Sequence, residues 1–491
     1  MNGGGDIGLF LKGLVILYIL SSLLLLPYGY NCLFLVYASR KYKARKPKKI
    51  HNVPFVTIQL PLYNERYVAR RLIESVGSLK WPKRKLQILV LDDSTDKTSE
   101  IVKCCVEKLK LKGHDIGILN RDERTGYKAG ALQNALKYSK GKYIAIFDAD
   151  FLPPPDFLNE TIALMEDDPI LGIVQARWGH INRRYNRFTE AFAIGIDGHH
   201  IVEQTGRSAL GLLINFNGSC GVLRKEAIID AGGWHHDTLS EDMDLSYRIQ
   251  LKGWKAIYLR DTIVKGEIPP SVVAFRNQQS RWAHGSIQCS RKLIKEVWRS
   301  KILSKAQKIE ATIHLTYYLI HPIMLLTLII SVPLLITNSF GSIPFLLPYG
   351  FMLSVCAMSS FSMYYTALNW QKIKMRTNII NLTLLCVIGY GLSARCTISV
   401  MKGIHKFGGV FERTPKYDIR KRHDDWRSKT YKPLRDFLYL DLFFTLYSFI
   451  GVIAALLTKV WPMAFYLSVY FFGYLIISYY LSVPSSLHVN R

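Results

Sequence analysis

Long apolar runs at both ends of the chain frame a more polar middle. Residues 9–37 are almost free of charge, with Lys12 as the exception, and this run exceeds the roughly 20 apolar residues that a membrane-spanning helix needs. Similar runs occupy residues 313–336, 344–368, 437–460 and 462–483. The pattern therefore predicts five membrane-spanning helices.

A sixth apolar segment, residues 378–401, is ambiguous because it contains Arg395 and several hydroxyl side chains. If this segment crossed the membrane, the loop after it would lie outside. Residues 402–435 of that loop carry eleven Lys and Arg, and such an excess favours the cytoplasmic side. We therefore expect 378–401 to form an interfacial or re-entrant helix, with the N-terminus outside and the polar middle of the chain in the cytoplasm.

The polar middle alternates short apolar runs with helical patterns, which is typical of a mostly parallel α/β sheet. Strands are predicted at residues 55–60, 86–91, 116–119 and 143–147, and helices at 66–79, 98–111 and 128–138. The chain thus divides into three parts. These are an N-terminal membrane helix with a basic stop (1–49), a cytoplasmic α/β domain with interfacial helices (50–305), and a helical C-terminal membrane domain (306–491).

The net charge of the chain indicates which kinds of molecule it could bind. The 491 residues include 64 Lys and Arg against 37 Asp and Glu, a net charge of +27, which suggests an anionic partner. The basic residues concentrate beside apolar runs, at 40–49 and 405–435, as expected at an anionic membrane surface rather than on nucleic acid. The block at 40–49 also argues against the alternative that the first apolar run is a cleaved signal peptide.

Cysteine and histidine spacing gives no sign of a structural metal. The eight cysteines contain no C-x-x-C pair, which favours a reducing compartment over a zinc site or a disulfide framework. The histidine pairs at 199–200 and 235–236 lack a third ligand at a suitable spacing, so we do not expect them to hold a metal.

Two acidic pairs, Asp92-Asp93 and Asp148-Ala149-Asp150, each follow a predicted strand. Ligands of open parallel sheets bind beyond the carboxyl ends of the strands, so both pairs are expected in one site. The spacing Asp-x-Asp suits Mg²⁺ or Mn²⁺, which can also grip a diphosphate. Aspartates that merely form turns are the structural alternative for either pair alone.

Two further motifs follow towards the end of the polar middle. Residues 240–244 (Ser-Glu-Asp-Met-Asp) match a helix start with Ser240 as N-cap, and such a start can also position a general base. Residues 278–282 (Gln-Gln-Ser-Arg-Trp) lie in an amphipathic stretch. An arginine there suits a phosphate and a tryptophan face suits a sugar ring, although both residues also anchor helices at membrane interfaces.

The order and spacing of these motifs over residues 50–300 resemble glycosyltransferase family 2. The likeness is to its processive membrane branch, which includes cellulose and hyaluronan synthases, and particularly to plant cellulose-synthase-like mannan and glucan synthases and their bacterial and archaeal relatives. Other matching segments are 59–65, 91–96, 126–132, 147–151, 174–178, 216–218 and 231–234. The resemblance implies a GT-A-like α/β domain and the inverting transfer of a hexose from UDP-glucose or GDP-mannose.

The resemblance also implies roles for individual residues. Asp242, with Glu241 beside it, would be the general base that deprotonates the acceptor hydroxyl, and Asp148 and Asp150 would bind the diphosphate through Mg²⁺ or Mn²⁺. Where the family usually has Thr before Glu-Asp, this chain has Ser240, which keeps the hydroxyl. The nucleotide would be held by Tyr63, Glu65, Asp92, Asp93, Lys128 and Gly130, and the diphosphate and acceptor by Gln278, Gln279, Arg281 and Trp282.

A second resemblance lies outside this domain. Residues 411–416 (Phe-Glu-Arg-Thr-Pro-Lys) resemble the gating loop of cellulose synthases, Phe-x-Val-Thr-x-Lys, with Arg413 in place of Val. The resemblance implies that Phe411, Thr414 and Lys416 close over the donor, with Thr414 and Lys416 near the diphosphate. A solvated basic loop near anionic lipid is the alternative.

The expected protein is a processive synthase that adds hexoses to a growing β-linked polysaccharide and extrudes it through the membrane. Its partners would be a nucleotide-sugar donor, a polysaccharide or glycan acceptor and membrane lipids, with no nucleic acid. A single-transfer enzyme that glycosylates a lipid would share the acidic motifs but need neither 278–282 nor the gating loop. A non-enzymatic transporter or receptor would be expected to carry polar residues at mid-membrane and would not need the ordered acidic motifs.

Overall fold

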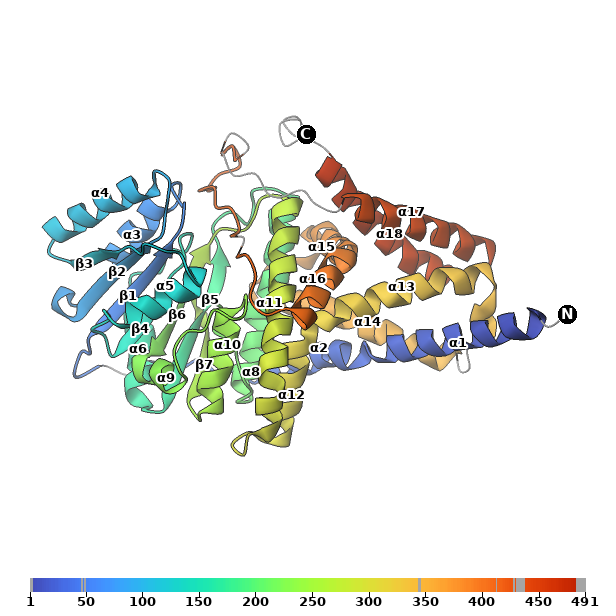
Figure 1. The fold of residues 1–491 in the computed structure, drawn as a ribbon, viewed down its shortest axis with the longest axis horizontal. Helices are drawn as coiled ribbons and strands as arrows, with labels where there is room; N and C mark the ends of the chain where they lie inside the picture. Colours follow the sequence, from blue (N-terminus) through green and yellow to red (C-terminus); the bar gives the residue numbers. More distant parts are fainter. Residues whose placement is uncertain are drawn as a thin grey trace.

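An α/β domain forms one end of an elongated molecule and a helical bundle forms the other (Figure 1). The computed structural model describes residues 3–45, 47, 50–342, 346–411, 413–426, 429 and 438–482. Helix α1 begins at the far end of the bundle, and the chain runs from there towards the sheet (Figure 1).

A seven-stranded sheet forms the centre of the α/β domain, in the order β3-β2-β1-β4-β6-β5-β7. Its strands are β1 (Val56–Leu62), β2 (Leu86–Asp92), β3 (Asp115–Leu119), β4 (Tyr143–Ile146), β5 (Leu171–His180), β6 (Gly221–Arg224) and β7 (Lys255–Gly266). Strand β6 pairs antiparallel with β4 and β5, and the other pairings are parallel. The predicted mostly parallel α/β sheet is confirmed, with β1 to β4 where the apolar runs placed them and β5 to β7 added.

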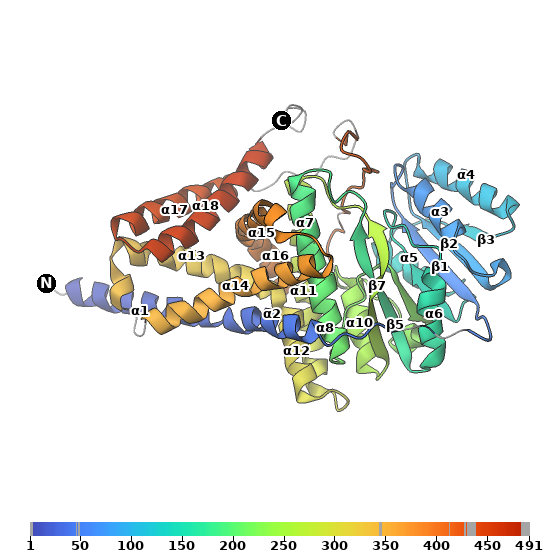
Figure 2. The ribbon, with the colours of Figure 1, turned by 180° about the vertical axis from the view of Figure 1, so that it is seen from behind.

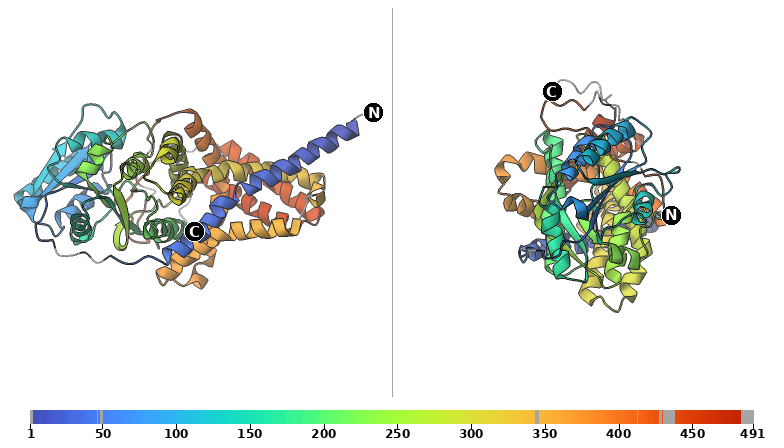
Figure 3. Two further views of the ribbon diagram at one scale, coloured as in Figure 1. Left: turned by 90° about the horizontal axis from the view of Figure 1, so that it is seen from below. Right: turned by 90° about the vertical axis from the view of Figure 1, so that its left-hand side faces the viewer.

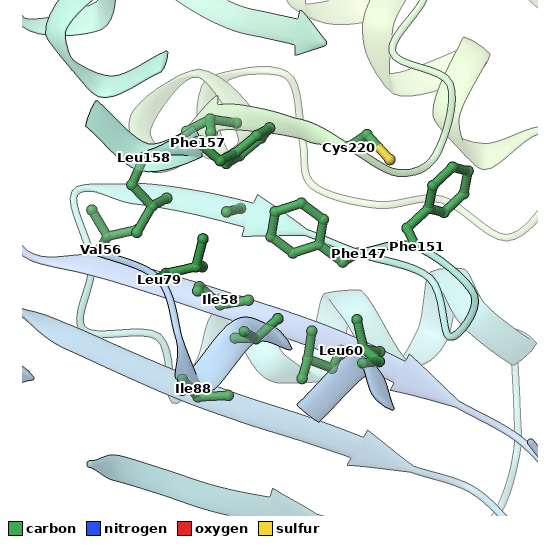
Figure 4. Packing of buried hydrophobic residues seen from close by; sticks show 14 of the residues in the cluster. Val56, Ile58, Leu60, Leu79, Ile88, Phe147, Phe151, Phe157, Leu158 and Cys220 are labelled. Carbon is green, nitrogen blue, oxygen red and sulfur yellow. The ribbon is translucent and has the colours of Figure 1, made fainter. Parts of the chain in front are cut away.

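The central strands are buried on both faces, which explains their nearly continuous apolar sequence. All seven residues of β2 are buried. Side chains of β1 and β2 on one face pack against α3 (Ala69–Gly77), α4 (Thr98–Leu111) and α6 (Phe157–Asp167), as Figure 4 shows for Ile58, Ile88 and Phe157. Replacing a core ring such as Phe157 with Ala would lower the free energy of unfolding by about 3–5 kcal/mol.

The opposite face of the sheet is covered by α5 (Tyr127–Leu136), α9 (Lys225–Asp230) and α10 (Glu241–Leu251). Helix α10 contributes Leu245 and Ile249 to this second cluster. Because these two residues are four apart, they lie on one side of the helix. Their burial fixes the rotation of α10 and therefore the direction in which its first turn points.

Helices that run across the long axis separate the sheet from the bundle. Helix α7 (Arg187–Asp197) continues through a π-helical turn, η2 (Gly198–Glu203), into α8 (Gln204–Ala209), and α11 (Val272–Arg299) follows β7. Figures 1 and 2 show α7 and α11 lying across the long axis of the molecule. Shorter turns are η1 (Lys83–Lys85), η3 (Tyr317–Leu319), η4 (Ser339–Ser342) and η5 (Met375–Thr377).

Long apolar helices make up the bundle and run roughly along the long axis (Figure 3). They are α1 (Gly3–Leu23), α2 (Leu26–Ser39), α13 (Ile320–Ile336), α14 (Leu346–Trp370), α17 (Leu438–Leu457) and α18 (Trp461–Ser482); α12 (Lys305–Thr316) leads into α13. Within the part of the chain that the structure describes, four stretches are long and apolar enough to cross a membrane: Gly8–Ser39, Lys305–Ile336, Leu438–Leu457 and Trp461–Ser482. They coincide with four of the five predicted spans.

The other two apolar segments behave differently. Helix α14 covers the predicted span 344–368 and has 25 residues, but it is not among the four that pass by length and apolarity. The segment predicted as an interfacial or re-entrant helix forms α15 (Ile379–Gly391) and α16 (Ser393–His405), bent by 48° at their junction. Such a bend fits a broken span or a re-entrant loop, and as one span this pair would make a fifth.

A fully buried ion pair ties the bundle to the α/β domain. Arg276 of α11 and Asp441 of α17 meet at 2.8 Å, and neither side chain is exposed. Removing one member would leave the other charge buried without its counter-ion, which is strongly unfavourable. The pair therefore fixes how α17 sits on α11.

Candidate active site

Residues of the predicted motifs gather beyond the carboxyl ends of three neighbouring strands. Tyr63 directly follows β1, Asp92 is the last residue of β2, and Asp148 stands two residues beyond β4. Since β2, β1 and β4 are adjacent and parallel, these ends share one edge of the sheet. This is the edge at which open α/β sheets bind ligands.

Asp148 and Asp150 lie against cationic side chains. Asp148 Oδ1 is 2.7 Å from the ammonium of Lys128. Asp150 Oδ2 is 2.9 Å from the ammonium of Lys416 and accepts the backbone N–H of Glu267 at 2.8 Å. Two held carboxylates that attract positive charge fit Mg²⁺ or Mn²⁺, since both ions prefer oxygen ligands.

Helix α10 begins at Glu241, so Glu241 and Asp242 lie in its first turn, where the helix dipole favours negative charge. Burial and then the charge of Glu241 raise the pKa of Asp242 to about 7, against the opposing charge of Lys128. A carboxylate with such a pKa is suited to act as a base near neutral pH. Ser240 precedes the helix as predicted, but its side chain makes no cap hydrogen bond; its hydroxyl packs instead against Gly285 of α11.

Lys128, at the start of α5, joins these acidic groups. Its ammonium donates to the carbonyl of Gly218 at 2.8 Å and lies 3.8 Å from Glu241. Burial alone would lower the pKa of Lys128, but Asp148 and Glu241 raise it overall, so the ammonium stays charged. Gly218 has a φ of +75°, and a methyl group there would lie 2.9 Å from Asp242 Oδ2. A glycine is therefore required beside Asp242.

Helix α11 carries the Gln-Gln-Ser-Arg-Trp motif along the same region. Burial lowers the pKa of Arg281, and the charges of Glu241 and Asp242 oppose this, so the guanidinium lies near these two carboxylates. Gln279 Oε1 accepts a hydrogen bond from the Tyr318 hydroxyl at 3.2 Å. Trp282 is half-buried on the same helix.

The predicted nucleotide side holds two arginines that the motifs did not single out. The guanidinium of Arg124 stacks 3.4 Å from the centre of the Tyr63 ring. Arg121 pairs with Asp93, with its Nε 3.1 Å from Asp93 Oδ1. Asp92 is buried, and its carboxylate accepts the backbone N–H two residues further on at 3.0 Å.

Gly130 is required by a close backbone approach. A methyl group at this position would lie 2.1 Å from the carbonyl oxygen of Thr125 and 2.6 Å from a guanidinium nitrogen of Arg121. The glycine thus lets the turn before α5 fold onto the helix. Its predicted role in lining the nucleotide pocket stays a prediction.

The predicted gating loop, residues 411–416, lies across this site and contributes two cations to it. Arg413 contacts Glu65 at 2.9 Å and Lys416 contacts Asp150 at 2.9 Å. Burial raises the pKa of Glu65 to about 7, and Arg413 opposes that rise. The loop therefore neutralises two acidic groups that were predicted to face the donor.

The rest of the loop fills the space in front of α5. The ring of Phe411 lies 6.3 Å from that of Tyr127, and Gln278 donates to Thr414 Oγ1 at 3.4 Å. Glu412 lies outside the described residues. The cavity left beside Phe411 has a volume of about 20 Å³. About 10–15 Å³ of such space is enough for one water molecule, so this cavity is far too small for a nucleotide-sugar.

Just after the loop, the chain is anchored to the α/β domain. The backbone N–H of Tyr417 donates to Glu267 at 2.6 Å, and Glu267 also pairs with Arg71 at 3.1 Å. Tyr417 is fully buried and packs against Trp426. Residues 411–416 are thus followed by a point at which the chain is fixed to the α/β domain.

Comparison with known proteins identifies the family. Residues 143–393, just over half of the chain, match the family described as Glycosyl transferase family group 2. The chain belongs to this family. The resemblance inferred from the motifs is thereby confirmed.

The curated relatives of this family member share about two fifths of its residues over the matched region. Glucomannan 4-beta-mannosyltransferase 1 of Oryza sativa subsp. japonica is 43% identical over 260 residues, covering 52% of this chain and 50% of the relative. Glucomannan 4-beta-mannosyltransferase 2 of Arabidopsis thaliana is 43% identical over 254 residues, covering 51% and 48%. The chain spans about half the length of the curated relatives it matches.

A solved structure shares the fold. A mannosyltransferase from Pyrobaculum calidifontis, in complex with GDP-Man and Mn²⁺, superposes with a TM-score of 0.54 at 20% identity. The match covers 79% of this chain and 99% of the other. Together with the family match, it confirms the predicted GT-A-like fold.

One further cluster of possible metal ligands lies beside the site. Over the ranges that the structure describes, His235, Asp237 and Asp244 are the group of such side chains that comes close together. The ammonium of Lys292 stands among them, 2.8 Å from Asp237, 3.0 Å from Asp244 and 3.0 Å from His235 Nδ1. A lysine thus supplies the positive charge in this cluster, which sequence spacing alone did not reveal.

Sequence reasoning found the carboxylates of the site but missed most of their partners. Arg121, Arg124, Arg71 and Glu267 belong to no motif, and in a chain with 64 Lys and Arg a single arginine carries no signal. Arg413 could have been predicted to pair with an acidic residue of the site, because it replaces the Val of the gating-loop pattern.

Proposed function

We propose that this protein is an inverting hexosyltransferase that moves a hexose from a nucleotide-sugar to a growing β-linked glycan. The observation that carries the proposal is the cluster at the carboxyl edge of the sheet, where the ammonium of Lys128 lies 2.7 Å from Asp148 and 3.8 Å from Glu241, the neighbour of Asp242. Direct displacement needs a base for the acceptor and positive charge for the leaving diphosphate. The names of the relatives, glucomannan 4-beta-mannosyltransferases, support GDP-mannose as donor, with UDP-glucose as the second candidate.

In the proposed reaction, Asp242 accepts the proton of the acceptor hydroxyl while its oxygen attacks the anomeric carbon. Attack comes from the face opposite the diphosphate, so an α-linked donor yields a β-linkage. A Cβ atom at residue 218 would lie 2.9 Å from Asp242 Oδ2, so Gly218 leaves room for that carboxylate. One base suffices, and no glycosyl-enzyme forms.

Positive charge for the leaving group comes from several directions. Asp148 and Asp150 would hold Mg²⁺ or Mn²⁺, which supplies charge to the diphosphate. Lys128 already lies between Asp148 and Glu241. Lys416 must leave Asp150, and its ammonium can then turn to the diphosphate as the loop closes again over a bound donor.

A processive reaction requires a path for the product, and accessible aromatic side chains of η3 and the bundle are candidates to line it. Tyr317 is 37% exposed, and Tyr318, Tyr364 and Tyr390 are half-buried. Aromatic faces there and at Trp282 suit the apolar faces of β-linked hexoses.

The same proposal places the α/β domain in the cytoplasm. Its support is the basic segment after α2 and the basic loop after α16, since Lys and Arg are retained on that side. A single-transfer enzyme that glycosylates a lipid is the rival; it would use Asp242 but need no gating loop.

The product distinguishes these possibilities. Purified full-length protein in lipid vesicles should be supplied with radiolabelled GDP-mannose and UDP-glucose in separate reactions, and the products sized by gel. The proposal expects a ladder or high polymer from at least one donor. A product that stays a monoglycosylated lipid at every donor concentration would decide for the rival, and no labelled product from either donor would contradict the proposed activity.

A further inference from the structure

A cavity of about 290 Å³ lies at the C-terminal end of α14. It is lined by Tyr365 and Asn369 of the last turns of the helix and by residues 372–375 of the turn that follows. It shares no lining residue with the small cavity beside Phe411. Pockets that bind small molecules begin at about 300 Å³, so the volume suits a ligand of modest size.

The turn after α14 has a fixed geometry. The backbone N–H of Lys372 donates to the carbonyl of Asn369 at 3.0 Å. That of Ile373 donates to the carbonyl of Leu368, also at 3.0 Å, and this pair of bonds is the Schellman motif that ends many helices. The side chain of Gln371 donates to the last residue of α7 at 2.8 Å. The cavity is therefore formed by a turn that is held in place from both sides.

Lys372 occupies the position of this motif that usually belongs to glycine. Its φ is +56°, a left-handed conformation that glycine adopts without strain and a residue with a Cβ does not. The stability of the turn thus gives no reason for a lysine here. A function of its side chain, which lines the cavity, does give one.

Four of the lining residues carry hydrogen-bond donors: Tyr365, Asn369, Lys372 and Lys374. Over the ranges that the structure describes, the polar side-chain atoms of these four residues have no hydrogen-bond or acidic partner within the protein. Two of the donors are positively charged. Several such donors around one cavity suit an anion with several acceptor oxygens, and phosphate is such an anion.

The cavity lies where the bundle meets the α/β domain. Helix α14 packs against α2 through a cluster that includes Met363 and Val36, and both helices end next to the α/β domain (Figure 2). Exposed apolar side chains lie close by in the sequence, with Trp370 at the end of α14 and Ile379 and Ile380 at the start of α15. Tryptophan is enriched at the level of lipid headgroups. The cavity is thus placed at the headgroup level of a bilayer that surrounds the bundle.

We propose that this cavity binds the phosphate of an anionic glycerophospholipid, from the leaflet on the side of the α/β domain. Lys372 and Lys374 would neutralise the phosphate, as basic pockets at the ends of membrane helices do for anionic headgroups. Tyr365 and Asn369 would donate to its oxygens, and the acyl chains would lie along the exposed apolar side of α15. A free phosphate could use the same donors but would leave these apolar side chains uncovered. The site does not depend on the proposed glycosyl transfer.

The test measures lipid binding to full-length protein in a neutral detergent. Dioleoylphosphatidylglycerol is the probe, zwitterionic dioleoylphosphatidylcholine is the comparison, and native mass spectrometry gives the dissociation constant of each. Phosphatidylglycerol should bind about tenfold more tightly, because two lysines face its net charge. Lys374→Gln should weaken its binding about fivefold, the effect expected of one lysine near anionic lipid.

Lys372→Gly separates binding from folding. Glycine suits a φ of +56°, so the thermal midpoint should equal or exceed that of wild type, while the dissociation constant for phosphatidylglycerol rises about fivefold. Lys301→Gln is the matched control for net charge. It removes an exposed lysine from the turn between α11 and α12 and should change the constant by less than twofold.

Three results would overturn the site. The first is equal affinity of wild type for the two lipids. The second is a dissociation constant for phosphatidylglycerol within twofold of wild type in Lys374→Gln, or a loss in Lys301→Gln as large as in Lys374→Gln. The third is complete displacement of the lipid by inorganic phosphate, which would identify a site for the free anion. If Lys372→Gly lowers the thermal midpoint, Lys374→Gln decides alone, because it leaves the left-handed position unchanged.

Discussion

Changing Asp242 to Asn should make the protein more stable and inactive at the same time. Burial and Glu241 raise the pKa of Asp242 to about 7. Each tenfold change in proton affinity corresponds to about 1.4 kcal/mol, so the folded protein opposes ionisation of this carboxyl by up to about 4 kcal/mol. The amide keeps the shape without the charge and should raise the free energy of unfolding at pH 8 by about 1–4 kcal/mol.

The effect has a defined pH dependence. Below about pH 4 the wild-type carboxyl is protonated in the folded and unfolded chains, so wild type and variant should be equally stable. Between about pH 4 and 7 only the unfolded chain loses the proton readily, so wild-type stability falls as pH rises. The difference in thermal midpoint should therefore be near zero at pH 4, grow to a few degrees and level off above pH 7.

Asp244→Asn is the matched control, two residues along the same helix. Asp244 is fully buried and paired with Arg248 at 2.6 Å and Lys292 at 3.0 Å. Its loss leaves Arg248 without its carboxylate and Lys292 with Asp237 as its remaining acidic partner among the described residues, and should lower the free energy of unfolding by up to about 3–5 kcal/mol. The two substitutions thus have opposite signs on stability.

The assays are thermal denaturation of purified protein over pH 4–8 and transfer of labelled hexose. Loss of a general base should lower the rate of transfer by about 10²–10⁴-fold. An Asp242→Asn protein with a lower midpoint than wild type at pH 8, or with wild-type transfer, would refute the argument that Asp242 is a strained base.

Three further outcomes are expected. Excess EDTA should abolish transfer and Mn²⁺ or Mg²⁺ restore it, since Asp148 and Asp150 would hold the ion; undiminished turnover in chelator would remove the metal role. Asp441→Asn should destabilise the protein by about 3–5 kcal/mol because Arg276 loses its buried counter-ion; an unchanged denaturation midpoint would contradict this. A single cysteine at Arg420 should react with an impermeant reagent only from the cytoplasmic side; labelling from outside would invert the loop and make residues 378–401 a true span.

The elements that could be predicted from the sequence are those whose pattern lies within one short stretch of the chain. Strands β1 to β4 were predicted to within two residues because each is a short apolar run next to a helix of clear period. Strand β5 pairs with β7, more than 80 residues later in the chain, and the outer half of β5 is only half-buried. Such a strand is specified by its distant partner, which no local pattern reveals.

The candidate site divides in the same way. Asp92, Asp148 and Asp242 were singled out because they follow predicted strands or open a helix, and because their order and spacing resemble those of glycosyltransferase family 2. The contact of Lys416 with Asp150 joins residues 266 positions apart. It leaves no trace in apolar periodicity, since it arises from the way distant elements pack.

Ser240 illustrates a partial success. Its position before α10 was predicted from helix-start preferences, yet its hydroxyl makes no cap hydrogen bond. Instead, the hydroxyl of Ser240 packs closely against Gly285 of α11. Tertiary contact thus overrides a local preference at the turn that presents the proposed base.

The anomeric configuration of the newly formed glycosidic bond tests the central claim most directly. Purified protein should be incubated with GDP-α-mannose or UDP-α-glucose and an oligosaccharide acceptor, and the product examined by proton NMR. Direct displacement assisted by Asp242 predicts a β-linked product from whichever donor is used. An α-linked product would contradict inversion, and the absence of any glycosidic product from both donors would contradict glycosyl transfer itself.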